Sequence, residues 1–151
     1  MSGILAILIL CIVFYQDLKQ RAIHLFVFAA LAIAFLAAKY LSDRPLLSID
    51  LILNCSFVIA LMIILLLYFR FRFGSWNLLD KGLGIGDLVF WLITALYLNF
   101  EWFVVWFNAS IIIAMIAHFA FRKFSWYGNE NKIPLAGLQA VPLIILIILN
   151  Q

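Results

Sequence analysis

The chain has 151 residues, of which 68% are hydrophobic and only 11% are charged. Soluble domains are about half apolar and about a quarter charged, so this composition excludes a water-soluble fold. The net charge of +3 includes no block of basic residues, and nothing indicates a nucleic-acid partner. A helix needs roughly 20 mostly apolar residues to cross a bilayer. The length therefore allows six or seven spans and no separate soluble domain.

Apolar runs between charged residues predict six membrane-spanning helices in one domain, residues 1–151. We therefore expect an all-α integral membrane protein, a bundle of six transmembrane helices. The first run lacks the basic leading region and small-residue cleavage site of a signal peptide, so we expect it to stay as the first span. In chain order, the segments are approximately Gly3–Gln16, Ala22–Tyr40, Leu51–Phe69, Asp87–Phe100, Trp102–Phe121 and Ile133–Asn150.

The basic residues predict the orientation in the membrane. Eight of the ten Lys and Arg residues follow the first, third or fifth segment, and only Lys39 and Arg44 lie in the other connections. Loops rich in Lys and Arg stay on the cytoplasmic side. We therefore expect a multi-pass protein of the cytoplasmic (inner) membrane, with the first, third and fifth connections in the cytoplasm and both termini outside.

Two segments are too short to cross the membrane as they stand. The first and the fourth have about 14 residues each, or about 21 Å of helix, whereas the hydrocarbon core is about 30 Å thick. The first can be extended only at its inner end, through Asp17. Asn99 and Glu101 stop the fourth on the outside, so it must be extended inward, toward Gly82–Asp87. Both Asp17 and Asp87 are thereby drawn to the cytoplasmic side of the membrane.

Two carboxyl groups at one depth suggest a reactive pair. An ionisable group in the membrane costs at least a few kcal/mol and marks a functional site by default. Two carboxyls in close approach cannot both ionise, so one keeps its proton. Together they act as general acid and general base on a water molecule, which is the chemistry of aspartic peptidases. This chemistry requires no metal and no cofactor, and the sequence has no Cys/His cluster with metal-ligand spacing.

Each aspartate also has a simpler interpretation. Asp87 follows three glycines at alternate positions in Gly82–Gly86, which permit the close approach of a substrate backbone. The alternative is a flexible loop with Asp87 as the N-cap of the next helix. Asp17 is followed by Lys19 and Arg21, and the alternative there is a charge cluster that only fixes the topology. The residues alone leave these alternatives open.

Three segments together resemble a known family of membrane proteases. Asp17–Ile23 has the pattern Asp-x-Lys-x-Arg-x-Ile and resembles the first aspartate motif of type IV prepilin peptidases and archaeal preflagellin peptidases. Gly84–Asp87 resembles their GxGD motif, which carries the second aspartate at the start of the fourth span. Ile133–Gly137 resembles the segment that enters their last span. The resemblance covers essentially the whole chain.

The resemblance implies an aspartic endopeptidase with Asp17 and Asp87 as the catalytic pair. Its substrate would be a prepilin-like precursor, cut at the cytoplasmic face between a short basic leader and a hydrophobic helix. The chain resembles a minimal form without the cysteine-containing cytoplasmic domain. It differs from the usual pattern at His24 and Val89. The implied supporting and substrate-binding residues are Lys19, Arg21, Lys81, Gly84, Gly86 and Pro134.

Two other function classes fit part of the pattern. Presenilins and signal peptide peptidases share GxGD, but their first aspartate lies deep in a longer span and a Pro-Ala-Leu motif follows later. The nearest match here is Pro134–Ala136. A non-catalytic transporter or assembly factor that relays protons would carry acids at several depths. The remaining acids instead lie in or beside the predicted loops: Asp43, Asp50, Asp80, Glu101 and Glu130.

Four small residues within the spans have structural interpretations. Asn54 and Asn108 are isolated polar groups, which predicts hydrogen bonds between helices. Cys11 and Cys55 lie in apolar runs, and we expect both to be buried packing residues.

Overall fold

The computed structural model describes residues 2–20, 22–40, 48–74, 84–121 and 134–149. Within these ranges, the secondary structure consists of six helices and no strands, as predicted. Helices α1, α3 and α6 are long and apolar enough to cross a membrane, and α2, α5 and α7 are shorter apolar helices. The chain is therefore a helical membrane protein. The helices are α1 (Ser2–Gln20), α2 (Leu25–Tyr40), α3 (Ser48–Phe73), α5 (Ile85–Ala95), α6 (Phe100–Phe121) and α7 (Leu135–Leu149).

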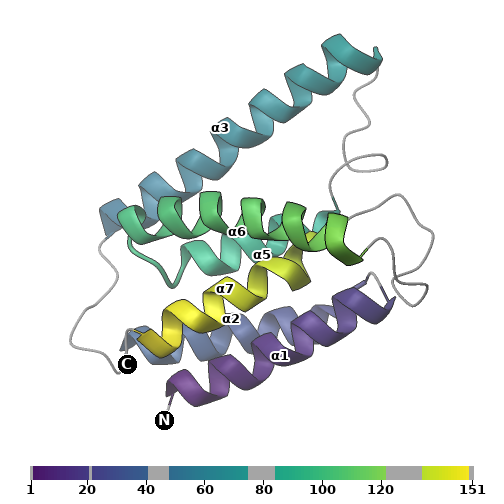
Figure 1. Cartoon of the computed structure of the whole chain (residues 1–151). Coiled ribbons are helices and arrows are strands. Elements are labelled where there is room, and N and C mark those ends of the chain that lie inside the picture. Colours follow the sequence, from purple (N-terminus) through teal and green to yellow (C-terminus); the bar gives the residue numbers. More distant parts are fainter. Residues whose placement is uncertain (1, 21, 41–47, 75–83, 122–133, 150–151) are drawn as a thin grey trace.

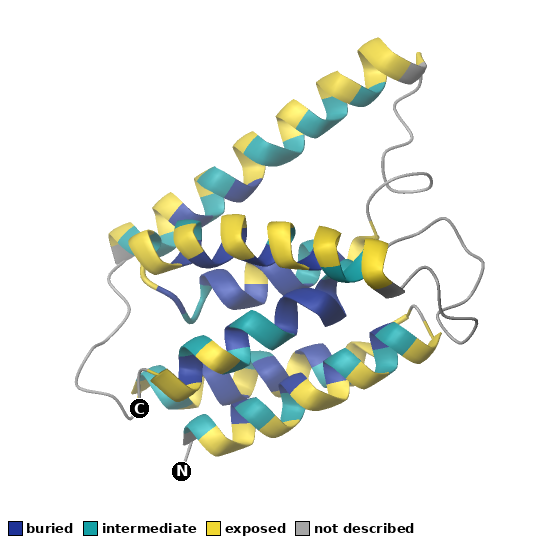
Figure 2. Cartoon of the chain, viewed as in Figure 1, coloured by how far each residue is buried: buried dark blue, intermediate teal, exposed yellow. Residues whose placement is uncertain are grey.

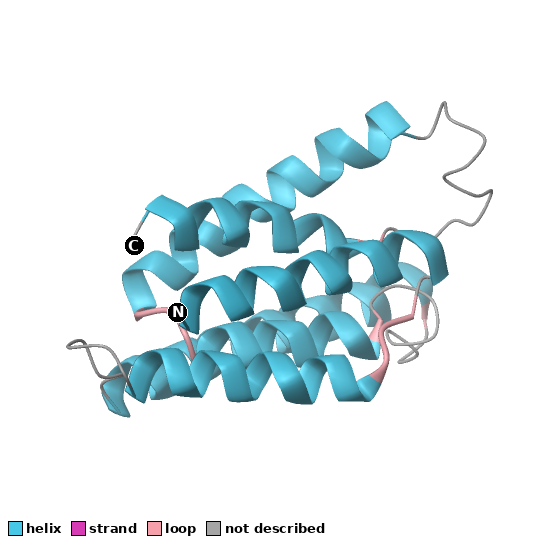
Figure 3. Cartoon of the chain, turned by 90° about the horizontal axis from the view of Figure 1, so that it is seen from below, coloured by secondary structure: helices cyan, strands magenta, loops and turns pink. Residues whose placement is uncertain are grey.

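Helix α7 lies between α1 and the pair of helices α5 and α6. It packs against α1 on one side and against α6 and α5 on the other. Helix α2 contacts α1 and α5, and α3 contacts α5 and α6. In Figure 1, α3 diverges from the bundle toward its C-terminal end, and the two chain termini lie at the same end of the molecule. Figure 3 shows the bundle from below, where the described residues form helices joined by short loops.

Burial is concentrated on the short helix α5 and on the inward faces of its neighbours (Figure 2). Six of the 11 residues of α5 are buried. By contrast, α3 buries only a small share of its residues. Its exposed side chains include Ile52, Ile59 and Ile64. This outward apolar face suits a lipid solvent, in which apolar side chains need no cover from water.

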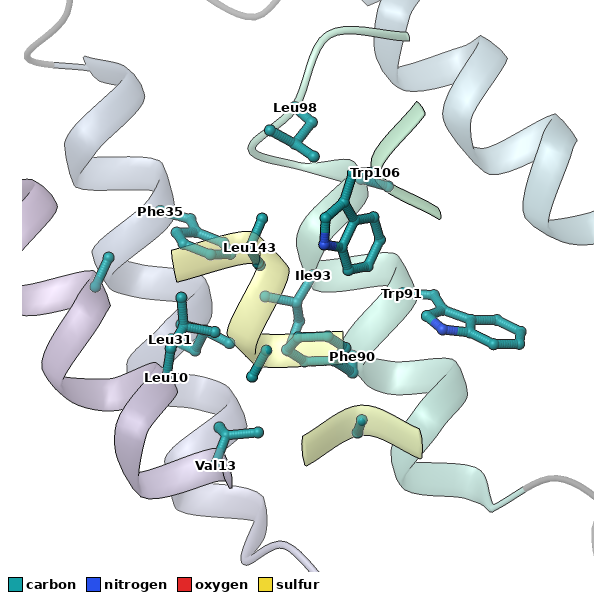
Figure 4. Close-up of a cluster of buried hydrophobic side chains, with 14 of the residues drawn as sticks. Leu10, Val13, Leu31, Phe35, Phe90, Trp91, Ile93, Leu98, Trp106 and Leu143 are labelled. Carbon is teal, nitrogen blue, oxygen red and sulfur yellow. The ribbon is translucent and has the colours of Figure 1, made fainter. Parts of the chain in front are cut away.

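The core at the centre of the bundle is rich in aromatic side chains (Figure 4). Trp91 of α5 packs edge-on against Phe107 of α6, with ring centroids 5.0 Å apart. Phe57 of α3 packs edge-on against Phe103 and Phe107, at 6.0 and 5.4 Å. Such edge-to-face pairs are the arrangement that aromatic rings prefer. They hold α5, α6 and part of α3 in one packed unit.

The helix boundaries agree with the predicted inward extensions. Helix α1 continues through Asp17 to Gln20, and α5 begins at Ile85, two residues before the predicted start. The outer end of α5 was predicted wrongly, because the helix ends at Ala95 and not at Phe100. Its 11 residues make about 16 Å of helix.

A side chain from another helix explains the early end of α5. Asn54 of α3 is fully buried, and its Nδ2 donates hydrogen bonds to the carbonyl oxygens of Ala95 and Leu98, at 3.1 and 2.8 Å. Carbonyls in the last turn of a helix have no partner within it. With a donor already present, the chain can turn there and start α6 at Phe100.

The prediction of interhelical hydrogen bonds is confirmed for Asn54 and wrong for Asn108. The exposed Asn108 donates to the carbonyl of Val104 in its own helix, at 2.8 Å. An asparagine in a helix can satisfy its amide locally in this way.

The two cysteines are also less buried than predicted, since Cys11 is exposed and Cys55 is partly exposed. Cys11 lies off the face of α1 that packs on the bundle.

We expect Asn54→Leu to destabilise the fold by about 1–2 kcal/mol, because it leaves the carbonyl of Ala95 at the end of α5 and that of Leu98 in the turn after it without their donor. Asn108→Leu is the matched control, since its hydrogen bond lies within one exposed helical turn. It should change the stability by less than about 0.5 kcal/mol. Equilibrium unfolding in mixed detergent micelles measures both. Equal effects of the two substitutions would contradict this account of the α5 terminus.

Candidate active site

Asp17 lies on the buried face of α1, near the C-terminal end of that helix. This face consists of Ala6, Leu10, Val13 and Asp17, each three or four residues from the next, so they line one side of the helix. Asp17 is 7% exposed. The apolar residues that pack α1 onto the bundle therefore also direct the carboxylate inward, toward α7.

Asp87 lies in the first turn of α5, where Gly84 is the N-cap residue. Its Oδ2 accepts a hydrogen bond from the backbone N–H of Gly84, at 3.1 Å. The alternative interpretation of Asp87 as the N-cap is thus wrong by three positions, but the side chain does cap the helix from the N3 position, as in a capping box. The residue is 9% exposed. Its second oxygen, Oδ1, contacts a different helix.

The N-terminus of α7 brings the two carboxylates together. The amide of Ala136 donates to Oδ1 of Asp87 at 2.8 Å, and the next amide, of Gly137, donates to Oδ2 of Asp17 at 2.6 Å. Amides in the first turn of a helix have no partner within it, and the positive end of the helix dipole favours anions there. Because the two amide nitrogens belong to neighbouring residues of one backbone, the two carboxylate oxygens that accept their hydrogen bonds lie within about 10 Å of each other.

Gly137 allows the close approach of α1. A Cβ atom at this position would lie 2.9 Å from Cβ and 3.0 Å from Oδ2 of Asp17. The 2.9 Å contact is closer than Cβ atoms approach in proteins, so an atom would have to shift, and the 3.0 Å contact is tighter than an ordinary van der Waals contact. The glycine is therefore required for the hydrogen bond between its own amide and Asp17.

The electrostatic setting follows from these contacts. Consecutive amides of α7 hold the carboxylates of Asp17 and Asp87, and both side chains are buried. Three backbone amides, from Gly84, Ala136 and Gly137, donate to them. Within the residues that the structure describes, no three His, Cys, Asp or Glu side chains gather as a metal site would require. The arrangement is that of two carboxyl groups held by backbone donors, which suits proton transfer.

The supporting residues implied by the family resemblance take different positions. Gly84 and Pro134 are at the site: Gly84 donates to Asp87, and the buried Pro134 directly precedes α7 and accepts from Leu138 N at 3.2 Å. Gly86 lies against the ring of Phe28. Lys19 is exposed, and its Nζ donates to the Tyr15 hydroxyl in the same helix at 3.0 Å. The other two, Arg21 and Lys81, lie outside the described residues.

Sequence reasoning did not predict the roles of the Ala136 and Gly137 amides. The signal was present, because proline is common at the start of a helix. Such a start exposes free amides to any nearby anion. What the sequence did not provide was the position of α7 relative to α1 and α5.

Comparison with known proteins identifies no relative. No protein-family model, no curated protein and no solved structure matches this chain.

Proposed function

We propose that this protein is a membrane aspartic endopeptidase that uses Asp17 and Asp87 to activate water. The observation that carries the proposal is the pair of consecutive amides, of Ala136 and Gly137, that hold one carboxylate each. This contact joins all three sequence motifs that resemble the prepilin peptidase family. Residues from α1, α5 and α7 meet there although they are distant in the sequence.

The chemistry requires only the two carboxyls and a water molecule. With one proton shared between them, the ionised group takes a proton from water while the protonated group hydrogen-bonds to the carbonyl oxygen of the peptide. The water oxygen bonds to the carbonyl carbon. Proton transfer to the leaving amine then breaks the C–N bond. Burial of both side chains strengthens each electrostatic contact in this sequence of steps.

The proposed substrate is a precursor with a short basic leader followed by a hydrophobic helix. Asp17 lies at the C-terminal end of α1 and Asp87 at the N-terminal end of α5. These are the ends next to the basic connections, which the positive-inside rule assigns to the cytoplasm. The polar leader would remain in the cytoplasm while the hydrophobic helix stays in lipid. The bond between them would then be at the depth of the carboxylates.

The position of the cut tests the proposal. The purified chain in lipid vesicles is mixed with a prepilin-like precursor, and mass spectrometry identifies the products. We expect one cut between the basic leader and the hydrophobic helix. A matched precursor with its leader Lys and Arg residues replaced by Gln should be cut more slowly. A cut within the hydrophobic helix would favour the presenilin-like alternative, and the absence of any cut would favour a non-catalytic role.

A further inference from the structure

A second polar contact joins α5 and α7 inside the aromatic core. Nε1 of Trp91 donates a hydrogen bond to Oε1 of Gln139 at 2.7 Å. Trp91 is 1% exposed and Gln139 is not exposed at all. In addition, Nε2 of Gln139 is buried without a hydrogen-bond partner among the described residues. A glutamine whose side-chain NH2 group has no acceptor costs stability, so packing alone does not account for it.

The position of this contact relates it to the carboxylates. Trp91 follows Asp87 by four residues on α5, and Gln139 follows Ala136 by three on α7. Residues three or four apart lie on one helix face. The Trp91–Gln139 bond is therefore the next contact along the same interface as the Asp87–Ala136 bond. The ring of Trp91 is itself held against Phe107 of α6.

We propose that Trp91 and Gln139 are positioning residues that fix the register of α7, so that its first-turn amides face Asp17 and Asp87. Apolar side chains would pack α5 against α7 in more than one register. A buried polar pair is satisfied in only one, and this is the best-established use of such pairs. If α7 rotated or slid by one residue, the amides of Ala136 and Gly137 would leave the carboxylates. This inference rests on the proposed peptidase function for its effect on catalysis.

The test compares Gln139→Leu, Trp91→Phe and the double variant with the wild-type protein, all as full-length chains in lipid vesicles. We expect each single variant to lower kcat for the precursor by about 10-fold to 100-fold, with KM changed less than about twofold, because small misplacements at a reactive site cost about this much. Thr94→Val is the matched control. Thr94 is also buried on α5, but its hydroxyl donates only to Phe90 in the same helix, so kcat should be unchanged.

The double variant separates positioning from stability. Removal of both partners leaves no unsatisfied group from the pair, so the melting temperature should recover relative to the single variants. If Trp91 and Gln139 position α7, kcat stays low in the double variant although the stability recovers. If kcat recovers together with the melting temperature, the pair only stabilises the fold and the inference is overturned.

Amide hydrogen exchange tests the inference without reference to cleavage. In the wild-type chain, the amides of Ala136 and Gly137 donate hydrogen bonds to the carboxylates, so their amide hydrogens should exchange slowly with solvent. Both single variants should speed exchange at these two amides about 10-fold or more, while amides in the middle of α1 stay unchanged. Unchanged exchange at Ala136 and Gly137 would overturn the inference. If the wild-type chain cleaves no precursor but the variants still exchange faster at these two amides, the register role is supported and the peptidase function is rejected.

Discussion

Asp17→Asn and Asp87→Asn are each expected to lower the cleavage of a prepilin-like precursor by about 100-fold or more. An amide can neither take a proton from water nor donate one as a carboxylic acid does, and acid–base catalysis contributes about 10²–10⁴-fold. In Asp17→Asn, the side-chain carbonyl oxygen would still accept from the Gly137 amide, so α1 should keep its contact with α7. Release of the leader, followed by mass spectrometry, gives the rates.

The double variant Asp17→Asn/Asp87→Asn provides a stricter test. Groups that act as one unit lose their effect together, so the double variant should be no slower than either single one. Glu101→Gln is the matched control. It removes an exposed acid from the first turn of α6 and should leave the rate unchanged. All variants must reach the membrane in equal amounts. A single variant with more than about a tenth of the wild-type rate would contradict the assignment of the dyad.

Gly137→Ala is expected to lower cleavage by about 100-fold. The new methyl group would lie 2.9 Å from Cβ of Asp17. This Cβ atom is bonded directly to the backbone, so rotation of the side chain cannot move it away. Either α1 moves away from α7 or the carboxylate leaves the Gly137 amide. A misplacement of about 1 Å at a reactive site costs about 100-fold in rate. The measurement is the cleavage rate per folded molecule, with folding followed by the melting temperature.

Gly86→Ala separates this effect from the general cost of replacing a glycine. A Cβ atom at Gly86 would touch only the ring of Phe28, at 3.7 Å, which is an ordinary contact. We expect a much smaller loss of rate than with Gly137→Ala, although Gly86 belongs to the more recognisable motif. If the two substitutions had equal effects, the close approach of α1 to Gly137 would not be what holds Asp17 in place.

Several features of the fold could be predicted because they depend on local composition. The long apolar runs required helices in lipid, since a bilayer leaves backbone groups no other partner. The shortness of the first and fourth runs predicted that helix would continue inward, and α1 does include Asp17. The outer end of α5 could not be predicted in this way. It depends on Asn54, which comes from α3.

The sequence by itself determined the helices and the presence of two carboxyl groups at the inner ends of two short apolar runs, because these depend on side chains along one segment. Only the tertiary structure decided which groups would hold these carboxylates. Every residue except proline has a backbone amide that can donate a hydrogen bond. The amides of Ala136 and Gly137 donate to Asp87 and Asp17 only because α7 packs between α1 and α5. A backbone donor has no side-chain identity, so its role depends on the position of its helix.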